Sequence, residues 1–225
     1  MKGKDLTERV YKEMKKDIML GNIPSNELFS EQMLSDRYNC SRTPAREAAG
    51  QLVMEGFLNK YPSKGYIIHL PTMRELRDMR HCRYVLESAG LEQIVRTAYT
   101  EDIRKLYPLA SPPETDSEEA IFSNMIFHLE LMKLCDNQTL LNLVERLHCL
   151  MMRNDVEQNQ MPVYDYLGIT HPQIKASPNP LLDEPNNHKA LLDAILERDI
   201  KKAKRMLQLD IYPGYLCDDS TNSKG

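Results

Sequence analysis

Residues 30–70 read SEQMLSDRYNCSRTPAREAAGQLVMEGFLNKYPSKGYIIHL, and this stretch decides the fold of the N-terminal part of the chain. Ser30 is suited to capping the start of a helix, and Asn39 tolerates the left-handed backbone that ends one sharply. Ser41 is suited to capping the next helix, and Gly56 to ending it. The pattern therefore predicts two short helices joined by a tight turn.

A β-hairpin is predicted directly after the second helix. Phe57, Leu58 and Tyr61 begin a strand, residues 62–65 (PSKG) have turn chemistry, and residues 66–70 form the returning strand. Two helices followed by a hairpin outline a winged helix-turn-helix, which places its second helix in the DNA major groove. The spacing of these elements alone is also consistent with an alternative, a small α/β domain whose basic face is exposed to solvent and does not bind DNA.

Several polar residues remain on the second helix once its apolar face is assigned. They lie in its first turn or so and are Ser41, Arg42, Thr43 and Arg46. Arginine can bind guanine edges or phosphate with two parallel hydrogen bonds, and hydroxyl groups can bind phosphate or base edges. Lys64 and Gly65, at the tip of the wing, could approach the DNA backbone or the minor groove.

The string SRTPAREA at 41–48, with the following LVMEGFL run and a glycine-containing wing, resembles the GntR family of bacterial transcription regulators. Cys40 and Ala45 stand where the family commonly has valine. A first helix also fits, because Leu6, Val10, Met14, Ile18 and Met19 form one apolar face. The segment 20–24 resembles the family's I-x-x-G-x-x-x-P-G motif, with Ser25 in place of the usual final glycine.

The resemblance implies specific roles for residues of the winged domain. It implies that Arg42 and Arg46 carry base or phosphate contacts. Secondary contacts are implied for Ser41, Thr43, Gln32, Lys64 and Gly65. Many relatives have arginine at the position of Gln32, so this chain departs from the family there.

Length and composition limit the classes of protein that remain. A chain of 225 residues is long enough for one large or two ordinary domains. No apolar run approaches the roughly 18 residues of a membrane span, and no basic-then-apolar signal segment opens the chain. Five widely spaced cysteines without a CxxC pair argue for a reducing cytoplasm and against a disulfide scaffold or a zinc–thiolate site.

The charge is unevenly divided along the chain. Residues 1–70 contain 11 Lys and Arg against 9 Asp and Glu, whereas residues 71–225 contain 18 against 24. Residues 1–70, called the head from here on, are thus slightly basic, and the rest of the chain is acidic. This division suits a protein that contacts DNA only through its head. Because the electrostatic footprint of one head is small, we expect a homodimer that reads a pseudo-palindromic operator.

The chain after the wing has a mainly helical pattern. Helices are predicted near residues 72–98, 100–109, 116–135, 138–153, 184–197 and 199–213. Residues 154–183 look irregular, and their role is not evident from the sequence. We therefore predict a mainly α protein with a winged helix-turn-helix at 1–71, an all-α antiparallel bundle at 72–215 and a disordered tail at 216–225.

The second domain resembles the FadR-like branch of the family, whose effector domain is called FCD. Four local pieces carry this resemblance: 79–87 (MRHCRYVLE), 124–128 (NMIFH), 136–140 (DNQTL) and 188–210. They resemble the family segments E-V-R-x-x-L-E, D-x-x-F-H, G-N-x-x-L and H-x-x-I-x-x-A-I-x-x-x-D with a closing His. Arg83 and Glu87 align with the Arg and the final Glu of the first of these family segments.

The resemblance also implies a metal site that holds an organic acid effector. In the family the ligands are an Asp and a His four residues apart, plus two His on the last helices, and such a set suits zinc or nickel. The matching residues here are Asn124, His128, His188 and Asp210. Compared with the family pattern, this chain has the amide of Asn124 at the Asp position and the carboxylate of Asp210 at the closing His position. A metal-bound site and a metal-free site are therefore both kept as alternatives.

Candidate effector contacts complete the site. Arg80 or Arg83 could bind a carboxylate group of the effector. The alternative for Arg83 is an ion pair with Glu87, four residues on. His148 could line the same cavity, whereas the histidines at positions 69, 81 and 171 are interpreted as ordinary core or surface residues.

The sequence thus predicts a cytoplasmic, DNA-binding transcriptional regulator, by resemblance a repressor relieved by its ligand, and not an enzyme. One alternative is a metal-dependent hydrolase that uses His128, His188 and Asp210. No HExxH motif, glycine-rich phosphate loop or nucleophile motif supports it. The other alternative is an architectural DNA-binding protein without an effector.

Overall fold

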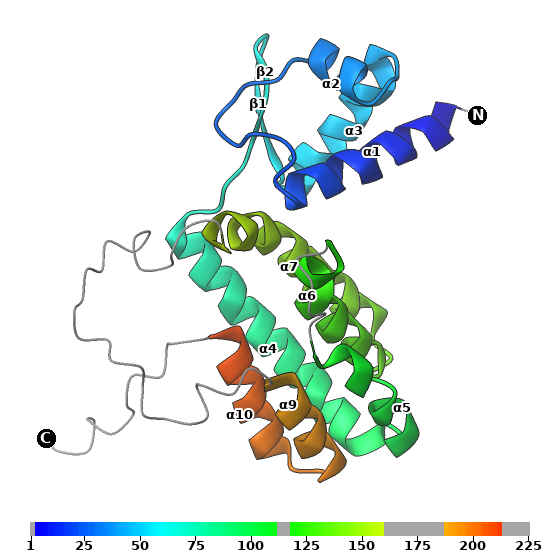
Figure 1. Cartoon of the computed structure of the whole chain (residues 1–225), viewed down its shortest axis with the longest axis vertical. Coiled ribbons are helices and arrows are strands. Elements are labelled where there is room, and N and C mark those ends of the chain that lie inside the picture. The colour runs from blue at the N-terminus through cyan, green and yellow to red at the C-terminus, as the bar shows by residue number, and fades with distance from the viewer. Residues whose placement is uncertain (1–2, 112–117, 160–186, 213–225) are drawn as a thin grey trace, which may run out of the picture. The chain divides into compact units, whose positions relative to one another are not determined.

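The computed structural model describes residues 3–111, 118–159 and 187–212 (Figure 1). Contacts between Cα atoms divide these residues into two compact units. The first unit contains 3–76 and 149–159, and the second contains the rest of the described residues. The predicted domain boundary between residues 71 and 72 stays a prediction.

Three helices and a hairpin build the N-terminal part of the first unit. The helices are α1 (Gly3–Met19), α2 (Glu31–Arg37) and α3 (Arg42–Glu55). Ser30 caps α2 by accepting a hydrogen bond from the Met33 amide, and Asn39 and Gly56 have positive φ where α2 and α3 end. Ser41 occupies the N-cap position of α3, although its side chain makes no capping hydrogen bond.

The wing is a two-stranded antiparallel hairpin of β1 (Leu58–Tyr61) and β2 (Gly65–Ile68), whose register pairs Leu58 with Ile68. A single bridge between Phe29 and Tyr66 ties the hairpin to the segment before α2. Its inward-facing residues, Leu58, Tyr66 and Ile68, are buried. The predicted winged helix-turn-helix is confirmed.

The described elements that follow the wing are all helical. They are α4 (Met73–Thr97), α5 (Thr100–Arg104), the 3₁₀ turn η1 (Tyr107–Leu109), α6 (Glu118–Lys133), α7 (Gln138–Asn159), α9 (Asn187–Leu196) and α10 (Ile200–Ile211). Thr72 and Glu75 form a reciprocal capping box that starts α4. The mainly α fold class predicted from the sequence is confirmed.

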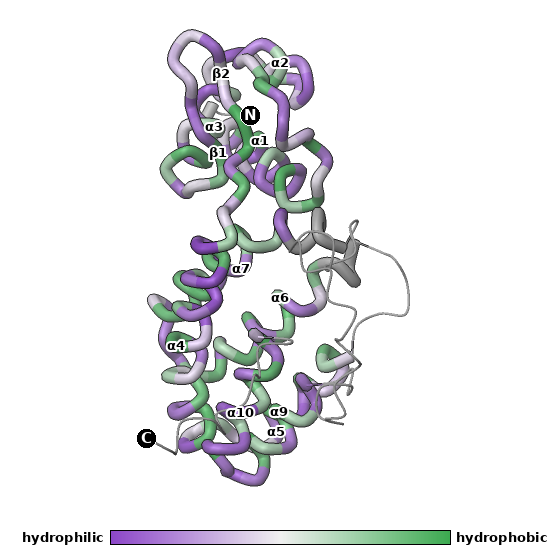
Figure 2. Tube along the Cα trace, turned by 90° about the vertical axis from the view of Figure 1, so that its left-hand side faces the viewer, coloured by the Kyte–Doolittle hydropathy of each residue, from purple (hydrophilic) through white to green (hydrophobic). Residues whose placement is uncertain are grey.

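A contiguous apolar core fills the second unit. Leu91, Ile94, Phe127, Val144 and Leu207 are among its fully buried members, and they come from α4, α6, α7 and α10. Green hydrophobic and purple hydrophilic positions alternate along α4 in Figure 2, as expected for a helix with one buried face. None of the described helices is long and apolar enough to cross a membrane.

Two predicted helix boundaries are wrong. The helix expected at 138–153 runs to Asn159, because no glycine or proline interrupts the chain before Pro162. The helix expected at 100–109 divides into α5, which ends at Arg104, and η1, which starts at Tyr107, because Pro108 has no N–H to donate to the Arg104 carbonyl. The predicted irregular segment beyond residue 159, His171 and the tail at 216–225 lie outside the described residues.

Candidate functional site

The start of α3 presents the predicted DNA-contacting side chains together. Ser41, Arg42, Thr43 and Arg46 are all exposed there. The Arg42 Nε donates a hydrogen bond to Gln32 Oε1 over 2.7 Å, and Gln32 Nε2 donates to Asp36 Oδ1 over 2.6 Å. Arg42 is therefore held by α2 before any DNA is present.

The wing tip gives different structural roles to its two candidate residues. Lys64 is exposed, so its ammonium group is available to a phosphate. Gly65 has a φ of +122°, and a Cβ built on it would lie 2.3 Å from the Phe29 carbonyl oxygen. The close approach of the Phe29 backbone to this turn thus requires a residue without a Cβ at position 65.

A buried polar cluster lies in the second unit, and His128 is at its centre. The His128 Nδ1 is 2.6 Å from Glu87 Oε2, and its Nε2 is 2.8 Å from Asp210 Oδ2. His128 and Glu87 have no exposed surface, and 10% of the Asp210 side chain is exposed. One imidazole from α6 is therefore held between carboxylates from α4 and α10.

Arg83 supplies the permanent positive charge of this cluster. Its Nε donates to Glu87 Oε1 over 2.6 Å, and its Nη2 lies 3.6 Å from Asp210 Oδ2. The ion pair with Glu87 that the sequence offered as an alternative is therefore present, but it is buried. The Nη2 atom is buried without a hydrogen-bond partner among the described residues.

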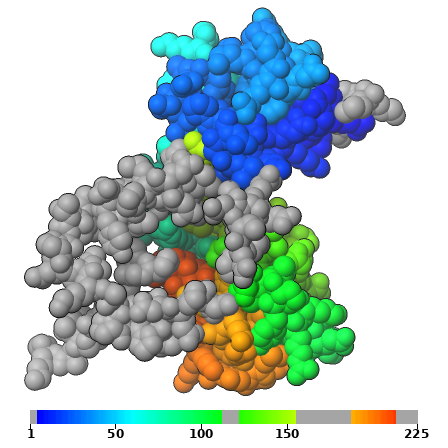
Figure 3. Space-filling view, viewed as in Figure 1, coloured from blue at the N-terminus to red at the C-terminus, as the bar shows by residue number. Residues whose placement is uncertain are grey.

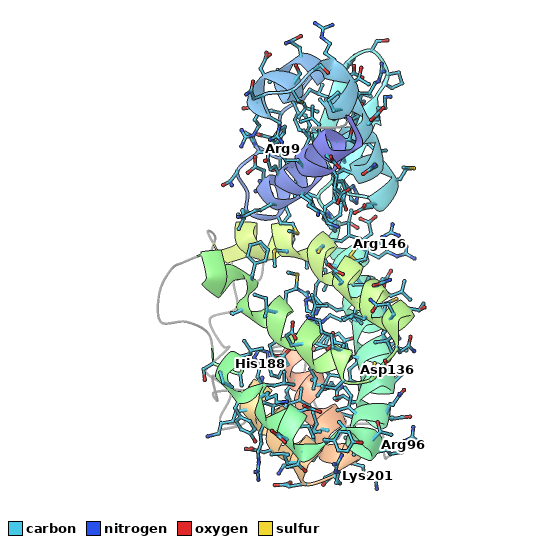
Figure 4. All side chains as sticks on the ribbon, turned by 90° about the vertical axis from the view of Figure 1, so that its right-hand side faces the viewer. Arg9, Arg96, Asp136, Arg146, His188 and Lys201 are labelled. Carbon is cyan, nitrogen blue, oxygen red and sulfur yellow. The ribbon has the colours of Figure 1, made fainter. Side chains whose placement is uncertain are left out.

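His188 joins the cluster from α9. Its Nε2 lies 3.1 Å from Asp210 Oδ1 and 3.2 Å from Asn124 Nδ2. Its ring stacks on Phe127, with ring centres 3.9 Å apart and an angle of 18° between the planes. Figure 4 labels His188 in the second unit. The four predicted metal-site residues are therefore connected to one another by these contacts.

His148, on α7, approaches the other carboxylate oxygen of Glu87. Its Nε2 is 3.5 Å from Glu87 Oε1 and has no hydrogen-bond partner among the described residues. Burial, with the nearby Arg83 charge, lowers the pKa of His148 to about 3, so its ring is neutral at physiological pH. A neutral imidazole can either donate or accept a hydrogen bond at this position.

The charges of the other members follow from their neighbours. Burial alone would raise the pKa of Glu87, but Arg83 and His128 outweigh it and hold that pKa well below its usual range. Burial likewise opposes ionisation of Asp210, and His128 and His188 overcome it and lower the Asp210 pKa. Burial would lower the pKa of His128, but Glu87 and Asp210 raise it despite Arg83. Two carboxylates thus face one guanidinium and one imidazolium.

The donor atoms of the cluster fit a divalent metal ion. One ligand atom each from His128, His188 and Asp210 lie within 4.8 Å of one another. The contact of Glu87 with His128 Nδ1 resembles the carboxylate–histidine arrangement that orients the other ring nitrogen toward a metal. A second set of three, Glu87, His128 and His148, also meets this distance. Arg83 already neutralises Glu87 there, which disfavours a second cation.

Glu87 is a member of the cluster that the sequence did not assign to the site. It lies four residues before the core residue Leu91 and seven before Ile94, so helical periodicity puts it on the buried face of α4. Arg83 shares that face. A buried carboxylate with its own guanidinium partner is the signal that could have identified Glu87. Arg80 is half-buried on the same helix.

Two family models match the chain. The model described as "Bacterial regulatory proteins, gntR family" matches residues 6–68, and the model described as "FCD domain" matches residues 78–211. The first covers the winged helix-turn-helix. The second covers more than half of the chain and includes every residue of the buried cluster.

Individual relatives agree with this assignment. The chain is 25% identical over 207 residues to the HTH-type transcriptional repressor GlaR of Escherichia coli K12, covering 88% of this chain and 89% of GlaR. It is 28% identical over 146 residues to the uncharacterised HTH-type regulator YdhC of Bacillus subtilis, covering 62% and 65% of the two chains. The solved structure of E. coli McbR/YncC has the same fold, with a TM-score of 0.69 at 21% identity over 92% of this chain and 95% of that one.

Proposed function

The chain belongs to the GntR family of bacterial transcriptional regulators with an FCD domain, and we propose that a small ligand at the buried cluster controls its operator affinity. Members of this family are DNA-binding regulators and not enzymes, so the hydrolase alternative is set aside. The FCD domain is a ligand-binding effector domain, which also sets aside an architectural protein without an effector.

DNA recognition is assigned to the start of α3. The observation that supports it is the exposure of Arg42 and Arg46 in the first turns of this helix, with Ser41 and Thr43 beside them. Gln32 fixes the Arg42 guanidinium through its Nε, which leaves the terminal nitrogens to bind a guanine edge or a phosphate. Lys64 adds a phosphate contact from the wing.

The test begins with selection of an operator from randomised duplex DNA by the full-length protein. Arg42→Ala and Arg46→Ala are each expected to weaken binding of that operator about 5- to 150-fold, the range for one lost bidentate base contact. Lys12→Ala, which removes an exposed charge from α1, is the matched control and should bind within about twofold of the parent. Undiminished binding by both arginine variants would overturn the assignment.

The effector site is assigned to the cluster around His128. The single observation that supports it is the convergence of His128, His188 and Asp210, with Glu87 behind the first of them. These three residues would hold zinc or nickel, and Asn124 offers a weak fourth ligand through its amide oxygen. A bound divalent ion would supply coordination positions for a carboxylate group of the effector.

The ligand class that fits this site is a small organic acid. The buried Nη2 of Arg83 and Nε2 of His148 are polar atoms whose hydrogen bonds a ligand could complete. Arg80 is half-buried on the same helix and could bind a second carboxylate group. By likeness to GlaR, which is named a repressor, we propose that the protein represses transcription until this acid binds.

A homodimer is proposed as the DNA-binding species. Two heads related by a two-fold axis would read a pseudo-palindromic operator, and one weakly basic head binds few phosphates. Val85 on α4 is 51% exposed, and it offers apolar surface for contact with a second copy. Light scattering should report a dimer, which Val85→Glu should weaken; a monomer at micromolar concentration would contradict the proposal.

Binding of metal at the cluster can be tested by thermal unfolding. Adding Zn²⁺ or Ni²⁺ to protein treated with a chelator should raise the unfolding temperature, because a ligand that binds only the folded state stabilises it. His188→Ala should abolish this shift, whereas the exposed histidine variant His81→Ala should retain it. An equal shift in all three proteins would place the metal elsewhere.

A further inference from the structure

A groove of about 430 Å³ lies in the second unit, where the last turns of α4 meet the start of α10. Its lining contains four cationic side chains and one carboxylate. These residues are Arg96, Arg198, Lys201, Lys204 and Glu92, with Val95 and Ile200 as the apolar part. In Figure 3 α9 and the first part of α10, in orange, form part of the surface of this unit. In Figure 4 Arg96 and Lys201 are labelled at the same end of the unit.

Two of the four cations already have partners. Lys204 forms a short ion pair with Glu92, which lowers the Glu92 pKa. Arg198 donates to the carbonyl oxygens of Val95 over 2.6 Å and Ala98 over 2.7 Å. The groove's one carboxylate is therefore already paired.

Arg198 changes the electrostatics of this end of α4. The last carbonyl groups of a helix carry a partial negative charge that repels anions. The Arg198 guanidinium covers these carbonyls, and its backbone has a φ of +58°, an unfavourable conformation for a residue with a long side chain. Arg198 thus neutralises the carbonyl groups at the end of α4, which would otherwise repel an anion in the groove.

The remaining two cations are available to a ligand. Lys201 has no hydrogen-bond or ion-pair partner in the described part of the chain, and Arg96 uses only its Nε, on the Glu92 carbonyl of its own helix. Two carboxylates that lie next to this turn in the sequence have partners of their own, because Asp199 caps α10 and Glu197 pairs with Lys202. The amide end of α10 adds partial positive charge on the same side.

We propose that this groove binds a small phosphorylated metabolite. Arg96 and Lys201 would bind the phosphate group, because charge-assisted hydrogen bonds from guanidinium and ammonium groups suit phosphate oxygens. Val95 and Ile200 would contact the apolar part of the ligand. A volume of this size suits a small molecule, and the site shares no residue with the His128 cluster. The proposal is independent of the effector assigned to that cluster.

Inorganic pyrophosphate is the probe for this groove. Calorimetric titration of the full-length protein at constant ionic strength should give saturable binding in the millimolar range or tighter. The double variant Arg96→Gln/Lys201→Gln should weaken that binding at least tenfold. Arg205→Gln removes an exposed charge from the same helix, outside the groove, and should bind within about twofold of the parent.

Other outcomes would overturn the proposal. Binding that weakens equally in the Arg205→Gln control and the double variant would indicate general charge attraction and no site. Absence of saturable binding by the parent protein, or equal affinity in the double variant, would show that the groove does not hold phosphate. Circular dichroism of each variant should match the parent, since all substituted side chains are exposed.

Discussion

His128 and Asp210 lie 82 residues apart in the sequence, and the His128 Nε2 is 2.8 Å from Asp210 Oδ2 in the folded chain. The other ring nitrogen contacts Glu87 over 2.6 Å. Without a metal the ring is therefore protonated on both nitrogens, and a metal must displace the proton on Nε2. The affinity for metal should consequently rise with pH.

Placing a carboxylate at position 124, where the family has Asp, should strengthen metal binding. Asn124→Asp replaces a weak amide ligand, whose Nδ2 now faces His188, by an anionic oxygen. We expect about tenfold tighter binding of Zn²⁺ in competition with a chromophoric chelator, because carboxylate oxygen is a regular zinc ligand and amide oxygen is not. Asn142→Asp adds the same charge at an exposed position on α7 and should leave the affinity unchanged.

Loss of the Glu87 charge should destabilise the second unit strongly. Glu87→Gln preserves the shape of the side chain but leaves the buried Arg83 and His128 with Asp210 as their one remaining carboxylate among the described residues. Breaking a buried ion pair costs about 3–5 kcal/mol in the free energy of unfolding, which urea denaturation can measure. Glu92→Gln, on the exposed surface of the same helix, is the control and should change stability little. Similar stability of both variants would contradict the buried network.

Two glycine substitutions in the first unit should have opposite effects. Gly65→Ala places a Cβ against the Phe29 carbonyl at a φ of +122°, so the wing should lose about 2 kcal/mol of stability or more. Gly50→Ala meets no atom within 4 Å in the middle of α3, and it should stabilise the protein by about 0.5–1 kcal/mol. Thermal unfolding measures both. A destabilising Gly50→Ala would show that the packing around α3 is tighter than described.

The head should lose stability in acid through Asp17. This carboxylate accepts hydrogen bonds from Asn22, Arg37 and Tyr38. Its partial burial raises its pKa, but these donors outweigh that effect and lower the pKa below its usual value. The stabilisation is therefore complete above the pKa of the unfolded chain, near 3.8, and disappears as pH falls through the lower pKa of the folded state.

The comparison of the parent with Asp17→Asn isolates this contribution. The parent should be the more stable protein at pH 7, and the difference in unfolding free energy should shrink as pH falls below about 4. Glu27→Gln, at an exposed position, should show no such convergence. A constant difference between the parent and Asp17→Asn from pH 7 to pH 3 would refute the role of the ionised carboxylate.

The winged helix-turn-helix was predictable because its signals are local. Ser30, Asn39 and Gly56 start or end helices through their own backbone and side-chain chemistry, and the structure confirms each of them. The residues His128, His188 and Asp210 were predicted to share a site by resemblance to the family. Their contacts join three helices that sequence spacing alone does not bring together.

Glu87 and the basic groove depend on contacts that the sequence pattern did not reveal. The pair of Arg83 and Glu87 has the same four-residue spacing as a surface ion pair, and burial alone distinguishes the two cases. The groove joins Arg96 to Lys201 across a separation of more than 100 residues. Its charge depends on Arg198, which donates hydrogen bonds to the carbonyl groups at the end of α4. This contact is evident only in the folded structure.

We propose that His128, His188 and Asp210 hold one divalent metal ion, to which the effector binds. Elemental analysis and native mass spectrometry of the purified full-length protein, beside His128→Ala, test it most directly. We predict one zinc or nickel ion per parent chain and none in the variant, with the same oligomeric state in both proteins. A parent chain that stays free of metal after incubation with both ions, or a variant that retains it equally, would contradict a metal site at these three residues.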